Sequence, residues 1–314
     1  MPRRLASLFV LFSIFLAACG GKGAAVGGES KPDLDADPLA LLPASAVAIA
    51  NVDAHALFAS ASLGPSLAPV ADALLPVGAD AGVVVSRDVD RIVVASYATG
   101  GIDLVAVLVG RFDPAKISGA TKAKTGAAVV PGAYGKFTTY TVGPVTYVPM
   151  TAKTLVAGTG DAVRRLLDRV AQGKLERSMP PWQIETLQTA GAEVAIVADL
   201  ASQGVASATI GSLSLPWVKA IKVARIIGNF EAPGMNFAAT LTYADAPAAQ
   251  SAADGVRTMG GWLKVLGPIL GGASIQNLEA TTAGADLQCK LSVDDQSLRT
   301  LLGLAVRFLP FAPQ

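Results

Sequence analysis

The sequence predicts an α+β fold made of two diverged tandem units, each a mainly antiparallel sheet with packed helices. Runs of alternating apolar and polar residues predict strands, and segments with a helical apolar period lie between them. Similar segments also recur about 134 positions apart, which is typical of an internal duplication. One irregular α+β domain is the alternative.

The first predicted unit, residues 39–172, alternates between strands and short helices. Asp113-Pro114 is typical of a helix start, because aspartate caps the first turn and proline fits it. Asp161 is expected to cap a later amphipathic helix in the same way. The predicted strands of this unit cover residues 47–52, 91–97, 102–112, 136–142, 145–150 and 154–157.

The second predicted unit, residues 192–314, follows a linker over residues 173–191. The linker contains paired prolines, Pro180 and Pro181, which do not occur inside helices or central strands. Residues 225–227 repeat residues 91–93 at the spacing of about 134, and residues 194–196 repeat residues 47–49 at about 147. The repeat predicts a final helix with Leu298, Leu301, Leu302 and Ala305 in the places of Val163, Leu166, Leu167 and Val170.

Residues 1–18 have the three parts of an export signal: a basic start, an apolar run and small residues before a cut. The apolar run has about 14 residues, fewer than the roughly 20 that a membrane-spanning helix needs. The string Leu16-Ala17-Ala18-Cys19 resembles the lipobox of bacterial lipoproteins. The resemblance implies cleavage between Ala18 and Cys19, a diacylglyceryl group on the Cys19 sulfur and an acyl group such as palmitate on its new amino terminus. Two or three acyl chains are enough for stable anchoring.

Residues 19–38 are rich in glycine and lack a hydrophobic period, so they predict a flexible tether between the lipid and the folded body. The body is similar to two-unit, periplasm-facing lipoproteins of high-GC Gram-negative bacteria. Gly20 stands where enteric bacteria commonly place aspartate to retain a lipoprotein in the inner membrane. The resemblance therefore implies the periplasmic leaflet of the outer membrane, with the inner membrane or the cell surface as alternatives.

The charge pattern gives no support to a nucleic-acid partner, since 25 basic and 24 acidic residues include no basic cluster. His55 is the only histidine, so neither a Ser-His-Asp triad around another base nor a zinc or copper site is expected. We interpret the alternating aspartates as a solvated linker, because they lack the offsets of a calcium loop. They are Asp33, Asp35 and Asp37.

Two pairs of neighbouring carboxylates are interpreted as turn and cap residues, and a glycosidase-like pair is the alternative. They are Asp88 with Asp90 and Asp294 with Asp295. Cys289 alternates with polar neighbours over residues 286–293 and is expected on the inward face of a strand as a small apolar residue. No catalytic residue, metal ligand or cofactor is therefore predicted, apart from the covalent lipid on Cys19.

These observations predict a lipid-anchored, non-enzymatic envelope protein that binds a partner or has a structural role. The first alternative is a carrier or sensor of an apolar ligand, which the low charge and the apolar segment over residues 262–275 suggest. A hydrolase is the second alternative, with His55 or the carboxylate pairs as its candidates.

Overall fold

A computed structural model describes most of the chain from residue 33 onward, and the residues from Leu34 belong to one compact unit. The predicted lipid site at Cys19, the cleavage site at Ala18 and the final helix around Leu298 lie outside the described residues. In that part of the chain, no helix is both long and apolar enough to cross a membrane. The described residues are 33–61, 63–77, 79–98, 103–201, 209–210, 213–214, 216–231, 234–266, 275–294 and 297.

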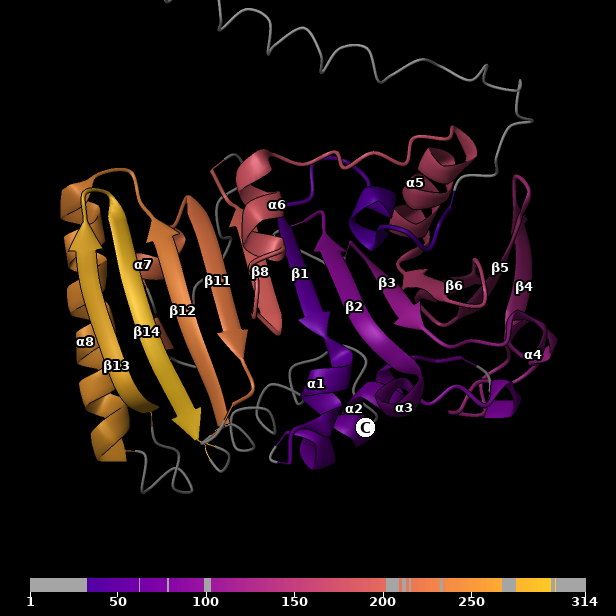
Figure 1. Cartoon of the computed structure of the whole chain (residues 1–314), viewed down its shortest axis with the longest axis horizontal. Helices are drawn as coiled ribbons and strands as arrows, with labels where there is room; N and C mark the ends of the chain where they lie inside the picture. The colour runs from indigo at the N-terminus through magenta and orange to yellow at the C-terminus, as the bar shows by residue number, and fades with distance from the viewer. Residues whose placement is uncertain are drawn as a thin grey trace, which may run out of the picture. The chain divides into compact units, whose positions relative to one another are not determined.

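Twelve of the described strands form one antiparallel sheet that continues through both predicted units (Figure 1). Its order is β13-β14-β12-β11-β8-β1-β2-β3-β7-β6-β5-β4, and β1 and β8 pair near its middle. The α+β class is therefore confirmed, and the two units share a single sheet. The strands are β1 (Ala48–Asp53), β2 (Val89–Ser96), β3 (Leu104–Gly110), β4 (Val130–Tyr134), β5 (Phe137–Val142), β6 (Val145–Pro149), β7 (Thr154–Gly158), β8 (Val194–Asp199), β11 (Val223–Asn229), β12 (Gly234–Thr242), β13 (Ile275–Ala283) and β14 (Asp286–Asp294). A separate pair is formed by β9 (Thr209–Ile210) and β10 (Leu213–Ser214).

Short helices connect the strands, and aspartates cap several of them. Asp113 accepts hydrogen bonds from two backbone N–H groups at the start of α4, as predicted. The prediction that Asp161 caps α5 is wrong, because α5 begins directly after β7 and Thr159 occupies the cap position. Asp161 instead lies in the first turn, 3.4 Å from Arg164. The helices are α1 (Ala54–Ala59), α2 (Gly64–Leu74), α3 (Val85–Asp88), α4 (Pro114–Gly119), α5 (Gly160–Ala171), α6 (Pro181–Leu187), α7 (Pro216–Lys219), α8 (Ala246–Leu266) and the 3-10 helices η1 (Pro38–Leu41) and η2 (Ala79–Ala81).

The strand order repeats outward from the central β1–β8 pair. On one side β2, β3, β7 and β6 follow β1, and on the other β11, β12, β14 and β13 follow β8. The predicted repeat makes Arg91 of β2 equivalent to Arg225 of β11. The pairing of β1 with β2 and of β8 with β11 then makes Asn51 equivalent to Ala195. The opening strands therefore align at about 144 residues, and the predicted spacing of 147 is wrong. The difference of three residues matters, because side chains alternate along a strand and an odd shift matches residues that face opposite sides of the sheet.

Two helical layers cover opposite faces of the sheet. We name the faces after α5 and α8. On the α5 face of the first half, α5 packs with η1 and α6 over valines of the sheet. On the α8 face, α1, α3 and α4 contribute to a second core in the first half, and α8 forms a third with β14 in the second half. Cys289 lies in this third core, as predicted, and burial raises the pKa of its thiol. Figure 1 shows α8 running along β13 and β14.

The two outer strands of the sheet have different protection. At one end, Arg257 of α8 donates from Nη2 to the Ala280 backbone oxygen of β13 at 2.6 Å. At the other end, β4 contains Pro131, which has no N–H to offer to another strand. Strand β4 was not predicted, because Pro131 and Gly132 both have low strand propensity. Such residues are tolerated at a sheet edge, where β4 pairs with β5 alone.

Replacing Gly158 by alanine is expected to lower the free energy of unfolding by about 1–3 kcal/mol, the usual cost of overpacking. Gly158 is buried at the end of β7, and a Cβ there would overlap the Leu104 carbonyl oxygen of β3. Urea denaturation of the purified protein measures this loss. Gly119→Ala is the control, since a Cβ at Gly119 meets no atom within 4 Å. Equal stability of the two variants would contradict the prediction.

The burial of the Tyr243 hydroxyl predicts that the protein loses stability at alkaline pH. Its side chain lies in the core under α8 and is only 3% exposed. Burial, with a smaller contribution from the Cys289 thiol, raises the pKa of the Tyr243 hydroxyl to about 12 from its ordinary value of 10.0. The folded protein therefore holds this proton more tightly than the unfolded chain does. The resulting stabilisation is complete below about pH 10 and is lost as the pH rises toward about 12.

Tyr243→Phe is expected to flatten the fall in unfolding free energy between about pH 10 and 12. At neutral pH the variant should be at least as stable as the parent, because the Tyr243 hydroxyl is buried and has no hydrogen-bond partner among the described residues. Urea denaturation at a series of pH values measures both effects. A variant that loses stability as steeply as the parent would contradict this expectation.

Candidate functional site

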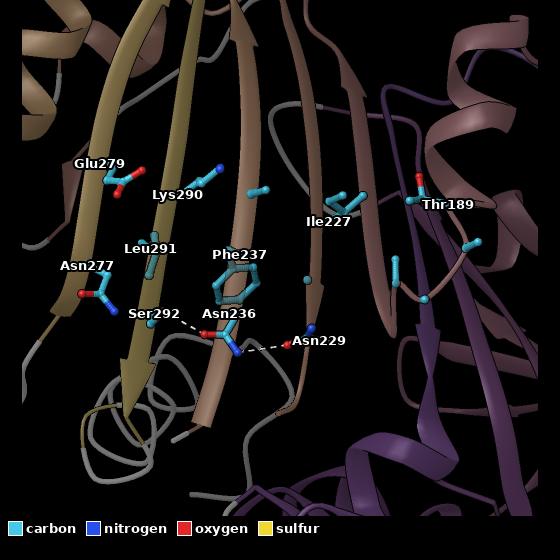
Figure 2. A pocket seen from close by; sticks show the side chains of 15 residues that line it. Thr189, Ile227, Asn229, Asn236, Phe237, Asn277, Glu279, Lys290, Leu291 and Ser292 are labelled. Atoms are coloured by element: carbon cyan, nitrogen blue, oxygen red, sulfur yellow. Dashed lines mark hydrogen bonds between the residues drawn. The ribbon is translucent and has the colours of Figure 1, made fainter. Parts of the chain in front are cut away.

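An open groove lies on the α5 face of the second half, over β11, β12, β14 and β13 (Figure 2). It consists of two adjacent hollows of about 490 Å³ and 470 Å³. Thr186 of α6 and the turn over residues 189–192 form one wall. The residues that line both hollows are Thr189, Ile227, Ala238, Glu279 and Lys290.

One row of paired residues shows how the groove differs from the corresponding surface of the first half. In the first half the row consists of valines that belong to the core under α5. They are Val93, Val107, Val156 and Val148. The row of the second half begins at the equivalent Ile227 and continues through the paired residues Ala238, Lys290 and Glu279. The second half therefore places charged groups where the first half has an apolar core.

A hydrogen-bonded chain of polar side chains borders this row. Asn236 of β12 donates from Nδ2 to Oδ1 of Asn229 at 3.0 Å and to the Glu231 backbone oxygen at 3.3 Å. Ser292 of β14 donates its hydroxyl to Oδ1 of Asn236 at 2.7 Å. Figure 2 shows these three side chains across neighbouring strands. The Asn236 amide is thus held in one orientation on the sheet surface.

The charges in the groove come in opposite signs. Lys290 and Glu279 occupy directly paired positions on β14 and β13, and both are exposed. Figure 2 shows both side chains on this part of the sheet. Arg225, at the end of the groove, lies with its guanidinium 5.1 Å from the centre of the Trp182 ring. The ring contact orients Arg225 without neutralising it, so the groove has a positive charge at its end and the Lys290–Glu279 pair in its middle.

The candidates named from the sequence lie elsewhere. His55 is exposed at the start of α1 and lines a different hollow, together with Asp35, Asp53 and Asp90. Asp35 accepts hydrogen bonds from the hydroxyls of Thr151 and Thr154 at 2.5 and 2.6 Å. Within the described part of the chain, no three His, Cys, Asp or Glu side chains gather so that they could hold a metal ion.

The other aspartates named from the sequence also have structural contacts. Asp37 caps η1 and lies 2.5 Å from Nε of Arg177. Asp88 binds the Arg87 guanidinium and the Val84 backbone N–H, and these contacts hold the pKa of its carboxyl below the usual range. Asp294 accepts a hydrogen bond from the Ser297 backbone N–H at 2.9 Å. The contacts of Asp88 and Asp294 agree with the interpretation of turn and cap residues, and Asp295 lies outside the described residues. The interpretation of the earlier aspartates as a solvated linker is wrong for Asp35 and Asp37, because both contact the folded body.

Sequence reasoning missed the groove. Its side chains stand at alternate positions of β12 and β14, where polar residues are the ordinary mark of a solvent-facing strand surface. The useful signal was the repeat, because it aligns Lys290 with Val156 at the same spacing of about 134 that relates Arg225 to Arg91. A valine replaced by lysine at the centre of a repeated sheet indicates a changed role for that face.

The chain shares its fold with the Treponema protein TP0453. Crystal form I of TP0453 matches with a TM-score of 0.54 and 10% identity, over 88% of this chain and 99% of that chain. Crystal form III matches with a TM-score of 0.53 and 11% identity, over 86% and 99% of the two chains. This likeness establishes the α+β fold. Neither a known protein family nor a curated protein matches the sequence.

Proposed function

We propose that this chain is a lipid-anchored envelope protein that binds a ligand in the groove and catalyses no reaction. The observation that carries the proposal is the groove itself, an open surface with an ordered polar network at positions where the first half has an apolar core. Its size falls within the range of roughly 300–1,000 Å³ that is usual for ligand sites. His55, the base considered for a hydrolase, lines another hollow and so supplies no base to the groove.

The anchor in this proposal is the lipid on Cys19, which follows from the lipobox resemblance of Leu16-Ala17-Ala18-Cys19. The anchored body would face the periplasm from the outer membrane, since Gly20 follows the cysteine. The tether would be shorter than the predicted residues 19–38, because Asp35 and Asp37 already contact the folded body. It would still give the groove reach away from the bilayer.

The proposal favours a polar ligand over the apolar one considered from the sequence. The cores on the two faces of the first half, and the core under α8, are filled by buried side chains. The two hollows of the surface groove, which this proposal uses, have a mixed polar and apolar lining.

The test is fractionation of cells that express the full chain, followed by mass spectrometry of the mature protein. We expect the protein in the outer-membrane fraction, with an amino-terminal peptide that begins at Cys19 and carries the mass of its acyl chains. A mature protein that begins at another residue, or that is found in the soluble fraction, would refute the anchor. Any polar ligand that travels with the protein should be identified in the same samples.

A further inference from the structure

Most of the polar side chains that line the groove are uncharged amides and hydroxyls. Each such side chain can both donate and accept hydrogen bonds. The hydroxyl groups of a sugar have the same double capacity, so the array complements a polyhydroxylated molecule. The side chains concerned are Asn229, Asn236, Asn277, Gln288, Thr189, Thr240, Thr281 and Ser292.

The charges of the groove favour a neutral ligand. Lys290 and Glu279 are paired across neighbouring strands, so their fields largely cancel at a distance. Glu279 would repel a polyanion that approaches Lys290, and Lys290 would repel a polycation that approaches Glu279. Charge complementarity in the middle of the groove therefore favours neither kind of chain, and Arg225, which keeps its positive charge, lies at the end of the groove beside Trp182.

The middle of the groove also has an apolar strip. Ile227 of β11 and Ala238 of β12 are paired neighbours in the row that ends at Lys290 and Glu279. A sugar ring combines an apolar C–H face with hydroxyls at its rim, and this strip beside polar groups matches that combination. The two hollows share these residues and form one elongated surface, which suits a chain of several rings.

A peptide that adds a strand to the sheet does not fit this floor. Strands β11, β12 and β14 have hydrogen-bonded neighbours on both sides, so they offer no free edge. Strand β13 does lie at the edge, and Arg257 occupies its Ala280 carbonyl oxygen. Recognition in the groove must therefore come from side chains.

We infer that the groove binds a neutral oligosaccharide, which lies along the strip of Ile227 and Ala238 and forms hydrogen bonds with Asn236, Lys290 and Glu279. The inference rests on the proposed function, because it names the ligand class of the same groove. The bonds from Ser292 to Asn236 and from Asn236 to Asn229 order the Asn236 amide before a ligand arrives. Such preorganisation reduces the entropy that is lost on binding.

The experiment is calorimetric titration of the full-length mature protein, extracted from membranes in a detergent that has no sugar headgroup. The neutral probes are the fully N-acetylated chitohexaose and maltohexaose, and an oligogalacturonate of similar length is the anionic probe. We expect at least one neutral hexasaccharide to bind with an affinity that changes little with salt. Asn236→Leu and Ser292→Ala should each weaken this binding, by up to about tenfold for the loss of one or two hydrogen bonds.

Gln250→Leu is the matched control, since it removes an amide from the exposed surface of α8 and should leave binding unchanged. Circular dichroism establishes whether each variant is folded. If Asn236→Leu does not fold, Ser292→Ala still tests the inference. The inference is overturned if neither neutral probe binds at about 5 mM, above the dissociation constant of ~1 mM that marks weak binding. It is also overturned if the oligogalacturonate binds more tightly with a steep salt dependence, or if both groove variants bind like the parent.

The titration separates this inference from the proposed function. Sugar binding by the extracted protein does not depend on how the chain is anchored. Failure of the titration with a lipidated Cys19 would refute the ligand class alone. A soluble, unlipidated protein that still binds the hexasaccharide would refute the anchor and leave the ligand class standing.

Discussion

Replacing Cys19 by serine is expected to abolish lipid attachment and to move the protein out of the membrane fraction. Only the cysteine sulfur can form the thioether that the lipobox resemblance implies, because a hydroxyl is a far weaker nucleophile. Each buried CH₂ of an acyl chain contributes about 0.8 kcal/mol, so the loss of two or three chains removes essentially all of the affinity for the bilayer. Fractionation, immunoblotting and the mass of the amino-terminal peptide measure the effect.

The chain supplies a matched control for this experiment, since Cys289 is the second of its two cysteines. Cys289 is buried under α8, and Cys289→Ser should leave processing and membrane partition unchanged while it lowers stability. A Cys19→Ser protein that is processed and partitions like the parent would show that lipid on Cys19 does not anchor this chain.

Replacing Leu167 by alanine is expected to lower the free energy of unfolding by about 2–5 kcal/mol. The Leu167 side chain is fully buried on α5, in the core that this helix forms with the valines of the sheet. Its truncation removes apolar contacts and leaves a cavity, because the surrounding strands are fixed by their pairing. Urea denaturation with circular dichroism gives the midpoint and the slope.

Arg164→Ala on the exposed side of the same helix is the control for Leu167→Ala. Arg164 pairs with Asp161 at 3.4 Å, and both side chains are largely exposed. Its removal should change the unfolding free energy by less than about 1 kcal/mol, as is usual for surface ion pairs. If both variants were destabilised equally, the core under α5 would not be the source of stability that we assign to it.

The alternation of apolar residues predicted most strands of the first half correctly, because solvent faces one side of a sheet and core the other. Two errors have local causes. Strand β4 contains Pro131, and the cap of α5 is Thr159 and not Asp161 because Thr159 is the one residue between β7 and the helix. The spacing of the opening strands was wrong because short apolar segments match each other in more than one register.

The groove could not be predicted from the sequence, because it depends on pairings between distant residues. Asn236 and Ser292 are 56 positions apart, and they meet only because β12 and β14 are neighbours in the sheet. The sequence shows that Lys290 stands at an outward position of a strand. The sequence does not show that Val156, the equivalent residue of the first half, lies beneath a helix. Only this comparison shows that Lys290 stands on a surface that is a buried core in the other half.

If the chain is anchored as we propose, the protection of the two outer strands matters at a crowded membrane surface. Molecules held on one surface meet far more often than molecules free in solution, and they share one orientation when they do. Open strands would then template the growth of mixed sheets from molecule to molecule. Pro131 at one end and Arg257 at the other oppose that growth, so many copies can stand side by side and remain separate.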